Sequence, residues 1–94
     1  MTGRHLLAAI ALAAAACDAR LPEPETPGAQ LYAARCGGCH RVYAPGLLTA
    51  DMWAVTVQRM QGELARRGVP PLTAAEQATV LDYLQRHSTG RAPQ

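Results

Sequence analysis

The feature that most limits how this chain folds is its small supply of large apolar side chains. The chain has 94 residues, and 34 of the 78 from Cys17 onward are hydrophobic, but 15 of those 34 are Ala or Cys. The remaining 19 side chains build only a thin core, and so small a domain buries little surface. We therefore expect a single domain completed by a disulfide, a metal or a cofactor, and not a self-sufficient enzyme with a deep pocket.

Residues 1–16 have the three parts of a secretory signal peptide: a positively charged start, an apolar stretch and small residues at its end. The apolar stretch is shorter than the roughly 20 residues that a membrane-spanning helix needs. Residues 14–17, Ala-Ala-Ala-Cys, resemble a bacterial lipobox, which predicts that Cys17 is lipidated and tethers the protein to the inner membrane. The alternative is an ordinary cut after Ala16 or Ala19. Both routes predict export to the periplasm.

Composition divides the rest of the chain into three parts. Residues 17–27 contain three prolines, which favours an extended tether. Residues 28–87 are expected to fold as the domain, and residues 88–94 to form a loose tail. From Cys17 onward, 8 Arg face 7 acidic residues, giving a net charge of +1. This balance excludes a strong electrostatic case for nucleic-acid binding, which needs a basic excess.

The run Cys36-Gly37-Gly38-Cys39-His40 is the decisive motif, because C-x-x-C-H is the attachment signature of c-type haem. Cysteines at this spacing can direct both sulfurs to the two vinyl groups on one edge of the ring. His40 then lies under the ring, where it can bind the iron, and the two glycines avoid a clash with the ring edge. The sequence thus predicts one covalent haem c on Cys36 and Cys39, with His40 as proximal ligand.

Three other interpretations of the two cysteines remain open. A thioredoxin-like redox site requires a βαβ context, and no strand pattern flanks the motif. A zinc site would have only His87 as a fourth ligand. A plain structural disulfide is the third. Export to an oxidising compartment and helical surroundings favour haem over all three.

Three helices are predicted from caps and apolar spacing. The first covers about 28–38 and has Pro27 at its start, and the second covers about 50–67, between a Thr49 N-cap and a Gly68 stop. Thr73-Ala74-Ala75-Glu76 is a capping box that opens the third helix. The buried side of that helix is expected to consist of Val80, Leu81, Tyr83 and Leu84.

The second helix carries the candidate distal ligand. At 100° per residue, Trp53, Val57, Met60 and Leu64 lie within about 60° of one another and form one apolar stripe. Met52 lies about 100° from Trp53, which makes Met60 the better thioether ligand. The simpler interpretation is that Met60 only packs in the core. We expect Trp53 to cover the haem edge, with its indole N–H directed at a propionate.

Residues 28–87 resemble a small class I, mono-haem cytochrome c domain. The resemblance rests on the Cys-His motif, on Gly28-x-x-Leu31-Tyr32-x-x-x-Cys36 as first helix, on Pro45-Gly46-Leu47 as the following loop and on 73–84 as last helix. It implies an all-α fold of three main helices wrapped around one covalently bound haem.

The resemblance also implies particular contacts. Gly28 would approach the last helix near Tyr83. The carbonyl of Pro45 would accept a hydrogen bond from His40 Nδ1–H and fix the ring, although a plain turn proline is an alternative. Independently of the resemblance, His87 shares a helix face with Val80 and is an alternative distal ligand, although its place at a helix end, where a cation is favoured, is the simpler explanation. Leu47 and Leu64 are expected to line the haem together with Trp53 and Met60, so that the apoprotein would be largely unfolded.

These features predict an electron carrier and not an enzyme. Redox partner proteins would meet it at the exposed haem edge, where Arg35, Arg41 and Arg59 can steer an acidic partner, although a solvated face is the simpler explanation of scattered arginines. Two other functions are kept open: a fixed cytochrome subunit of a periplasmic dehydrogenase complex, and a five-coordinate haem sensor or enzyme. As an electron carrier the chain would be a monomer, and as a dehydrogenase subunit it would be part of a permanent complex.

Overall fold

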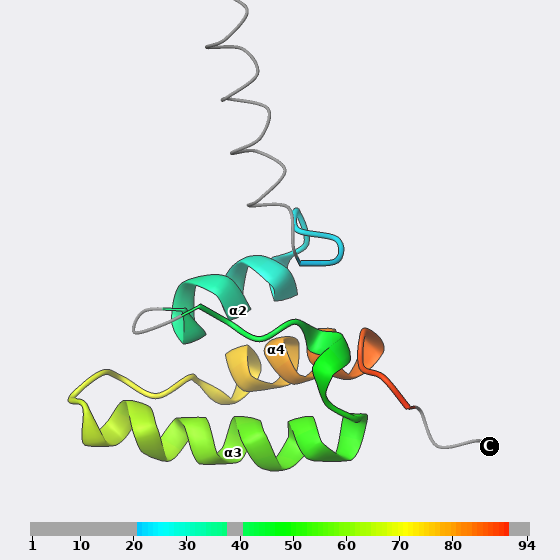
Figure 1. Cartoon of the computed structure of the whole chain (residues 1–94). Coiled ribbons are helices and arrows are strands. Elements are labelled where there is room, and N and C mark those ends of the chain that lie inside the picture. Colours follow the sequence, from blue (N-terminus) through cyan, green and yellow to red (C-terminus); the bar gives the residue numbers. More distant parts are fainter. Residues whose placement is uncertain (1–20, 38–40, 91–94) are drawn as a thin grey trace, which may run out of the picture.

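The computed structural model describes residues 21–37 and 41–90, and within these it is all-helical, as predicted. The elements are α2 (Pro27–Cys36), the short 3-10 helix η1 (Pro45–Leu47), α3 (Ala50–Arg66) and α4 (Ala74–Arg86) (Figure 1). Within the described ranges, no helix combines the length and the apolar character needed to cross a membrane. The predicted signal peptide, Cys17, Cys39 and His40 lie outside the described residues.

Local capping explains where the helices begin and end. The Thr49 hydroxyl accepts a hydrogen bond from Met52 N–H at 3.2 Å, and α3 ends before Gly68, whose φ of 71° suits glycine. The predicted capping box opens α4: Thr73 Oγ1 accepts from Glu76 N–H at 3.1 Å, and Glu76 Oε1 accepts from Thr73 N–H at 2.9 Å. The sequence therefore located both long helices to within a residue or two.

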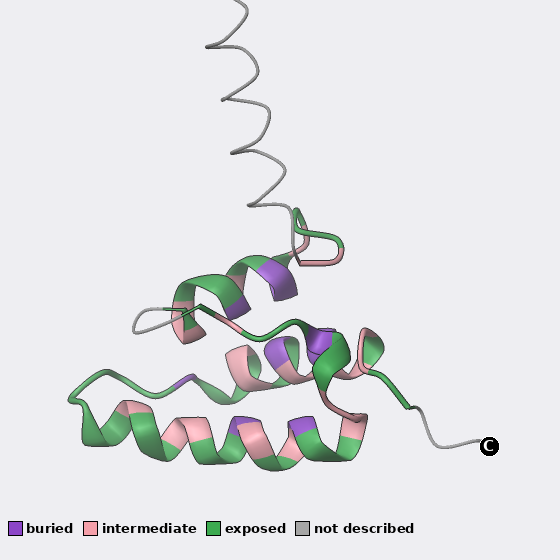
Figure 2. Ribbon diagram, viewed as in Figure 1, coloured by how far each residue is buried: buried purple, intermediate pink, exposed green. Residues whose placement is uncertain are grey.

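The last helix, α4, is the centre of the packing. In Figure 1 it lies between α2 and α3, and it contacts both. Figure 2 shows that the buried positions of α2 and α3 occur on the faces turned toward it. Among the described residues, the buried hydrophobic side chains are Ala29, Tyr32, Trp53, Val57, Leu72, Val80, Tyr83 and Leu84. This core is thin, as the count of apolar residues predicted.

The contact between α2 and α4 depends on Gly28. A Cβ atom built at Gly28 would lie 2.6 Å from Tyr83 Cβ and 3.3 Å from the carbonyl oxygen of Thr79. Real carbon atoms do not approach so closely, so only glycine permits this crossing. The predicted close approach of Gly28 to the last helix is confirmed.

The segment that precedes α2 packs against α4. Tyr83 donates its hydroxyl hydrogen to the carbonyl of Pro22 at 2.8 Å, and Leu21 packs on the core. Glu23 Oε2 lies 3.0 Å from His87 Nε2 and 3.9 Å from Arg86 Nη1. Residues 21–26 are therefore docked on the domain, whereas an extended tether was expected. The imidazole of His87 thus contacts Glu23 of this segment.

Candidate functional site

A cavity of about 320 Å³ lies where the C-terminal end of α2 faces α3. It is within the volume range of about 300–1,000 Å³ typical of small-molecule and cofactor sites. Most of its surface is apolar. The lining residues are Tyr32, Ala34, Arg35, Cys36, Val42, Tyr43, Trp53, Thr56, Met60, Glu63, Leu64, Arg67 and Val69.

Helix α2 provides the thiol of the cavity. Cys36, the last residue of α2, is half-buried and lies on the cavity wall, and Cys39 and His40 follow outside the described residues. Burial raises the pKa of the Cys36 thiol, and the nearby Arg35 charge only partly opposes this. Redox-active cysteines normally have a lowered pKa, so this environment does not favour the thioredoxin-like alternative. No strand occurs in the described ranges to supply its βαβ context.

Helix α3 provides the thioether. Three residues of the predicted apolar stripe, Trp53, Met60 and Leu64, line the cavity, whereas the fourth, Val57, is buried in the core. Met52 is absent from the lining, and half of its surface is exposed (51%). The cavity therefore has a thiol from one helix and a thioether from another, surrounded by apolar side chains. These residues fit a covalently attached haem with a methionine ligand.

The expected role of the Trp53 indole N–H is wrong. Trp53 is 1% exposed, and its Nε1–H donates to the carbonyl oxygen of Pro45 at 2.8 Å. A buried N–H must find a partner, and the backbone of η1 supplies one, so this N–H is not available to a propionate. The Pro45 carbonyl has a second lone pair, so the predicted bond from His40 stays a prediction.

Two other residues lie differently from what was expected. Leu47 is 64% exposed and does not line the cavity. It belongs to the single turn of η1, whose buried residue is Pro45. His87 also lies outside the cavity lining, because it contacts Glu23 next to the start of α2. The alternative of His87 as a distal ligand therefore has no support in this arrangement.

Tyr32 is a site residue that sequence reasoning missed. It is 2% exposed, it lines the cavity, and its ring meets Trp53 edge-on at 6.0 Å. Its hydroxyl donates to the carbonyl of Tyr43 at 2.7 Å, and burial raises its pKa, so the hydroxyl stays protonated. The available signal was spacing, because Gly28, Tyr32 and Cys36 follow one another every four residues on one helix face.

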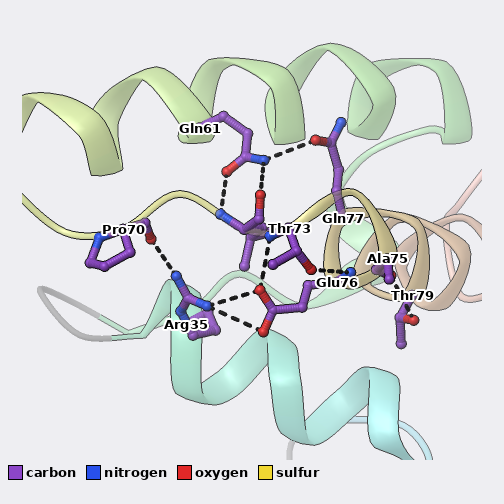
Figure 3. A network of polar contacts seen from close by, with 9 residues as sticks. Arg35, Gln61, Pro70, Thr73, Ala75, Glu76, Gln77 and Thr79 are labelled. Atoms are coloured by element: carbon purple, nitrogen blue, oxygen red, sulfur yellow. Dashed lines mark hydrogen bonds and ion pairs between the residues drawn. The ribbon is translucent and has the colours of Figure 1, made fainter.

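Arg35 makes contacts that sequence reasoning missed. It lines the cavity, but its guanidinium is engaged on α4 and on the connector between α3 and α4 (Figure 3). Its Nη1 lies 3.2 Å and 3.4 Å from the two carboxylate oxygens of Glu76, and its Nη2 donates to the carbonyl of Pro70. The Arg35 charge is thus paired with Glu76 within the fold, and the steering of a partner stays a prediction.

The connector is held from its other side by Gln61. The Gln61 side-chain amide donates to Leu72 O at 2.9 Å and accepts from Leu72 N–H at 2.7 Å (Figure 3). The same amide donates to Gln77 Oε1 at 2.9 Å. Arg35 and Gln61 therefore fix the connector between them, next to the cavity-lining residue Val69.

Comparison with known protein families gives one match. Residues 32–94 match the family model described as dihaem cytochrome c. The match covers 63 of the 94 residues, including the C-x-x-C-H motif and both long helices. The protein is thus a c-type cytochrome. The chain belongs to the dihaem cytochrome c family.

The family match leaves one part of the sequence-based prediction unconfirmed. It supports a c-type cytochrome, but it names a dihaem family and not the mono-haem class I proteins that the sequence resembles. The chain as printed contains a single C-x-x-C-H motif, at 36–40. Searches of curated proteins and of solved structures found no significant match. Membership of this family indicates covalent haem c and haem-based electron transfer.

Proposed function

We propose that the protein is a periplasmic electron carrier with one covalently attached haem c. Cys36 and Cys39 would hold the haem, His40 would be the proximal ligand of the iron, and Met60 the distal ligand. The observation that carries this proposal is the cavity that contains Cys36 at the end of α2 and Met60 on α3. The motif supplies the other sulfur and the imidazole.

The chemistry follows from the ligands. Bound haem supplies an iron that gains or loses one electron without making or breaking a bond in the protein. His40 and Met60 would both bind the iron, and a methionine ligand would raise its reduction potential. Tyr32, Trp53 and Leu64 line the cavity, and such a surround would shield a bound haem from water, which further disfavours the more highly charged ferric state. An iron held by both residues would leave no position for a substrate, as expected of a carrier and not of an enzyme.

Met52 provides a matched control for the ligand assignment. Both methionines lie on α3, but only Met60 lines the cavity. We expect the protein, expressed with haem-attachment machinery, to show a Met-to-iron charge-transfer band in its oxidised spectrum. Met60→Ala should lose the band, and Met52→Ala should keep it. Loss of the band in Met52→Ala, or its retention in both variants, would contradict the assignment.

Location and partners are part of the same proposal. A signal peptide with a lipidated Cys17 would tether the protein to the inner membrane, and redox proteins would meet it at the exposed haem edge. Copurification separates a free carrier from a fixed dehydrogenase subunit, because a stable large partner favours the subunit. Carbon monoxide binding by the reduced protein at neutral pH would instead indicate a five-coordinate haem, and so would exclude Met60 as a firm ligand.

A further inference from the structure

Arg35 directly precedes Cys36, one of the two predicted haem attachment residues. Arg35 lines the cavity, and Glu76 on α4 does not. The two side chains form an ion pair of 3.2 Å, with 25% of the arginine and 33% of the glutamate side chain exposed. This pair is thus shielded from water more than the exposed pairs of the described residues, such as Arg86 with Asp82 at 48% and 68% exposure.

The geometry of the pair is fixed from three sides. Glu76 is the third residue of the capping box, so Thr73 N–H holds one of its oxygens at 2.9 Å. The guanidinium of Arg35 reaches Glu76 with Nη1 and the Pro70 carbonyl with Nη2 (Figure 3). The pKa of Glu76 is lowered, first by the hydrogen bond from the Thr73 backbone and also by the charge of Arg35. The carboxylate is therefore ionised at neutral pH.

A fixed charge beside a haem acts on its reduction potential. The ferric state carries one more positive charge than the ferrous state, so a nearby cation disfavours it and a nearby anion favours it. The strength of this effect depends on distance and on shielding from water. Arg35 lines the cavity, whereas Glu76 contacts the Arg35 guanidinium without lining the cavity itself.

We propose that Arg35 and Glu76 act as a pair on the reduction potential of the haem, with Glu76 offsetting part of the increase that the Arg35 cation alone would cause. This inference rests on the proposed function, because it needs the haem to occupy the cavity. Both are positioning residues: they act on the haem through charge and ligate nothing. In this arrangement one ion pair between α2 and α4 would adjust the reduction potential at which the haem transfers electrons.

The test is a potentiometric titration of the haem-loaded protein and its Glu76→Gln variant. Glutamine is accepted at the third position of a capping box, and its oxygen can still accept from Arg35, so the change removes charge while keeping the hydrogen-bond pattern. We expect the midpoint potential to rise. Asp82→Asn is the matched control, because it removes the same charge from the same helix, about 9 Å further along the axis. It should leave the potential close to that of the native protein.

Variants of Arg35 separate charge from packing. Arg35→Gln should lower the potential, because it removes the cation and leaves the Glu76 carboxylate. Arg35→Lys keeps the charge but loses the planar fork, so it should lower thermal stability while keeping a potential nearer to that of the native protein than Arg35→Gln does. The charge-transfer band should persist in both Arg35 variants and in Glu76→Gln if His40 and Met60 still bind the iron.

The outcomes distinguish this inference from the proposed function. A protein without covalent haem overturns both. A protein with haem and a normal charge-transfer band, but with an unchanged or lowered potential in Glu76→Gln, overturns the inference alone. An equal rise in Asp82→Asn also overturns it, because the effect would then reflect overall charge and not this pair.

Discussion

The replacement of Gly28 by alanine tests how α2 crosses α4, the contact on which the fold depends. The added Cβ would lie 2.6 Å from Tyr83 Cβ and 3.1 Å from Tyr83 Cγ. Tyr83 cannot move aside easily, because it is fully buried and its hydroxyl is bound to the Pro22 carbonyl. The helices must separate, and overpacking of this kind typically costs about 1–3 kcal/mol.

Gly62 provides the control. It lies within α3, and an added Cβ would meet nothing within 4 Å. Gly62→Ala should therefore show only the helix preference of alanine over glycine, which stabilises a helix by about 0.5–1 kcal/mol. The same chemical change is thus expected to have opposite signs at two positions.

Thermal unfolding of the haem-loaded variants, followed by circular dichroism at 222 nm, measures both effects. In a domain of this size, each kcal/mol shifts the melting temperature by about 4–8 °C. We expect Gly28→Ala to melt below the native protein by about 4 °C or more, and Gly62→Ala to melt a few degrees above it. A Gly28→Ala variant as stable as Gly62→Ala would refute the packing derived for α2 on α4.

Three further predictions concern other contacts. Trp53→Phe removes a buried hydrogen bond and should lower stability by about 1–2 kcal/mol in thermal unfolding. Gln61→Ala removes both bonds to Leu72 and should cost about 1–3 kcal/mol in denaturant unfolding, whereas Gln58→Ala, at an exposed position, should cost under about 1 kcal/mol. The lowered pKa of Glu76 predicts a stability contribution that is present above the ordinary glutamate pKa of about 4.3 and lost as pH falls below it; Glu76→Gln should lose less stability over this range.

Each of these predictions has a contrary result. An unchanged melting temperature in Trp53→Phe would mean that the indole N–H is not bound in the folded protein. Equal losses in the Gln61 and Gln58 variants would mean that the connector is not held by the Gln61 amide. If the stability of Glu76→Gln fell with decreasing pH by as much as that of the native protein, the Glu76 carboxylate would not be paired in the folded state.

Local sequence signals predicted the helices of the fold. Contacts between residues far apart in the sequence could not be predicted in this way. The caps at Thr49 and Thr73 and the stop at Gly68 involve neighbours within a few residues, so their pattern can be read directly from the chain. The same holds for the placement of Met60 on the cavity side of α3, because a helix has a fixed period. These predictions need no knowledge of the tertiary structure.

The contacts that were missed join distant parts of the chain. Arg35 and Glu76 are 41 residues apart, and Tyr83 and Pro22 are 61 apart. The Trp53 indole had two chemically suitable acceptors, a propionate and a backbone carbonyl, and only the folded position of η1 decides between them. Where a side chain has several suitable hydrogen-bond partners, only the three-dimensional structure shows which one it binds, and sequence spacing does not give this information.

The most direct test of the account is the intact mass of the denatured protein after expression with haem-attachment machinery. The mass is compared with that of the Cys36→Ala/Cys39→Ala double variant, so that any lipid on Cys17 is present in both. We predict that, after correction for the two substitutions, the native protein exceeds the variant by the mass of one haem. Equal corrected masses would contradict covalent attachment at this motif, and a difference of two haems would contradict the single-haem site described here.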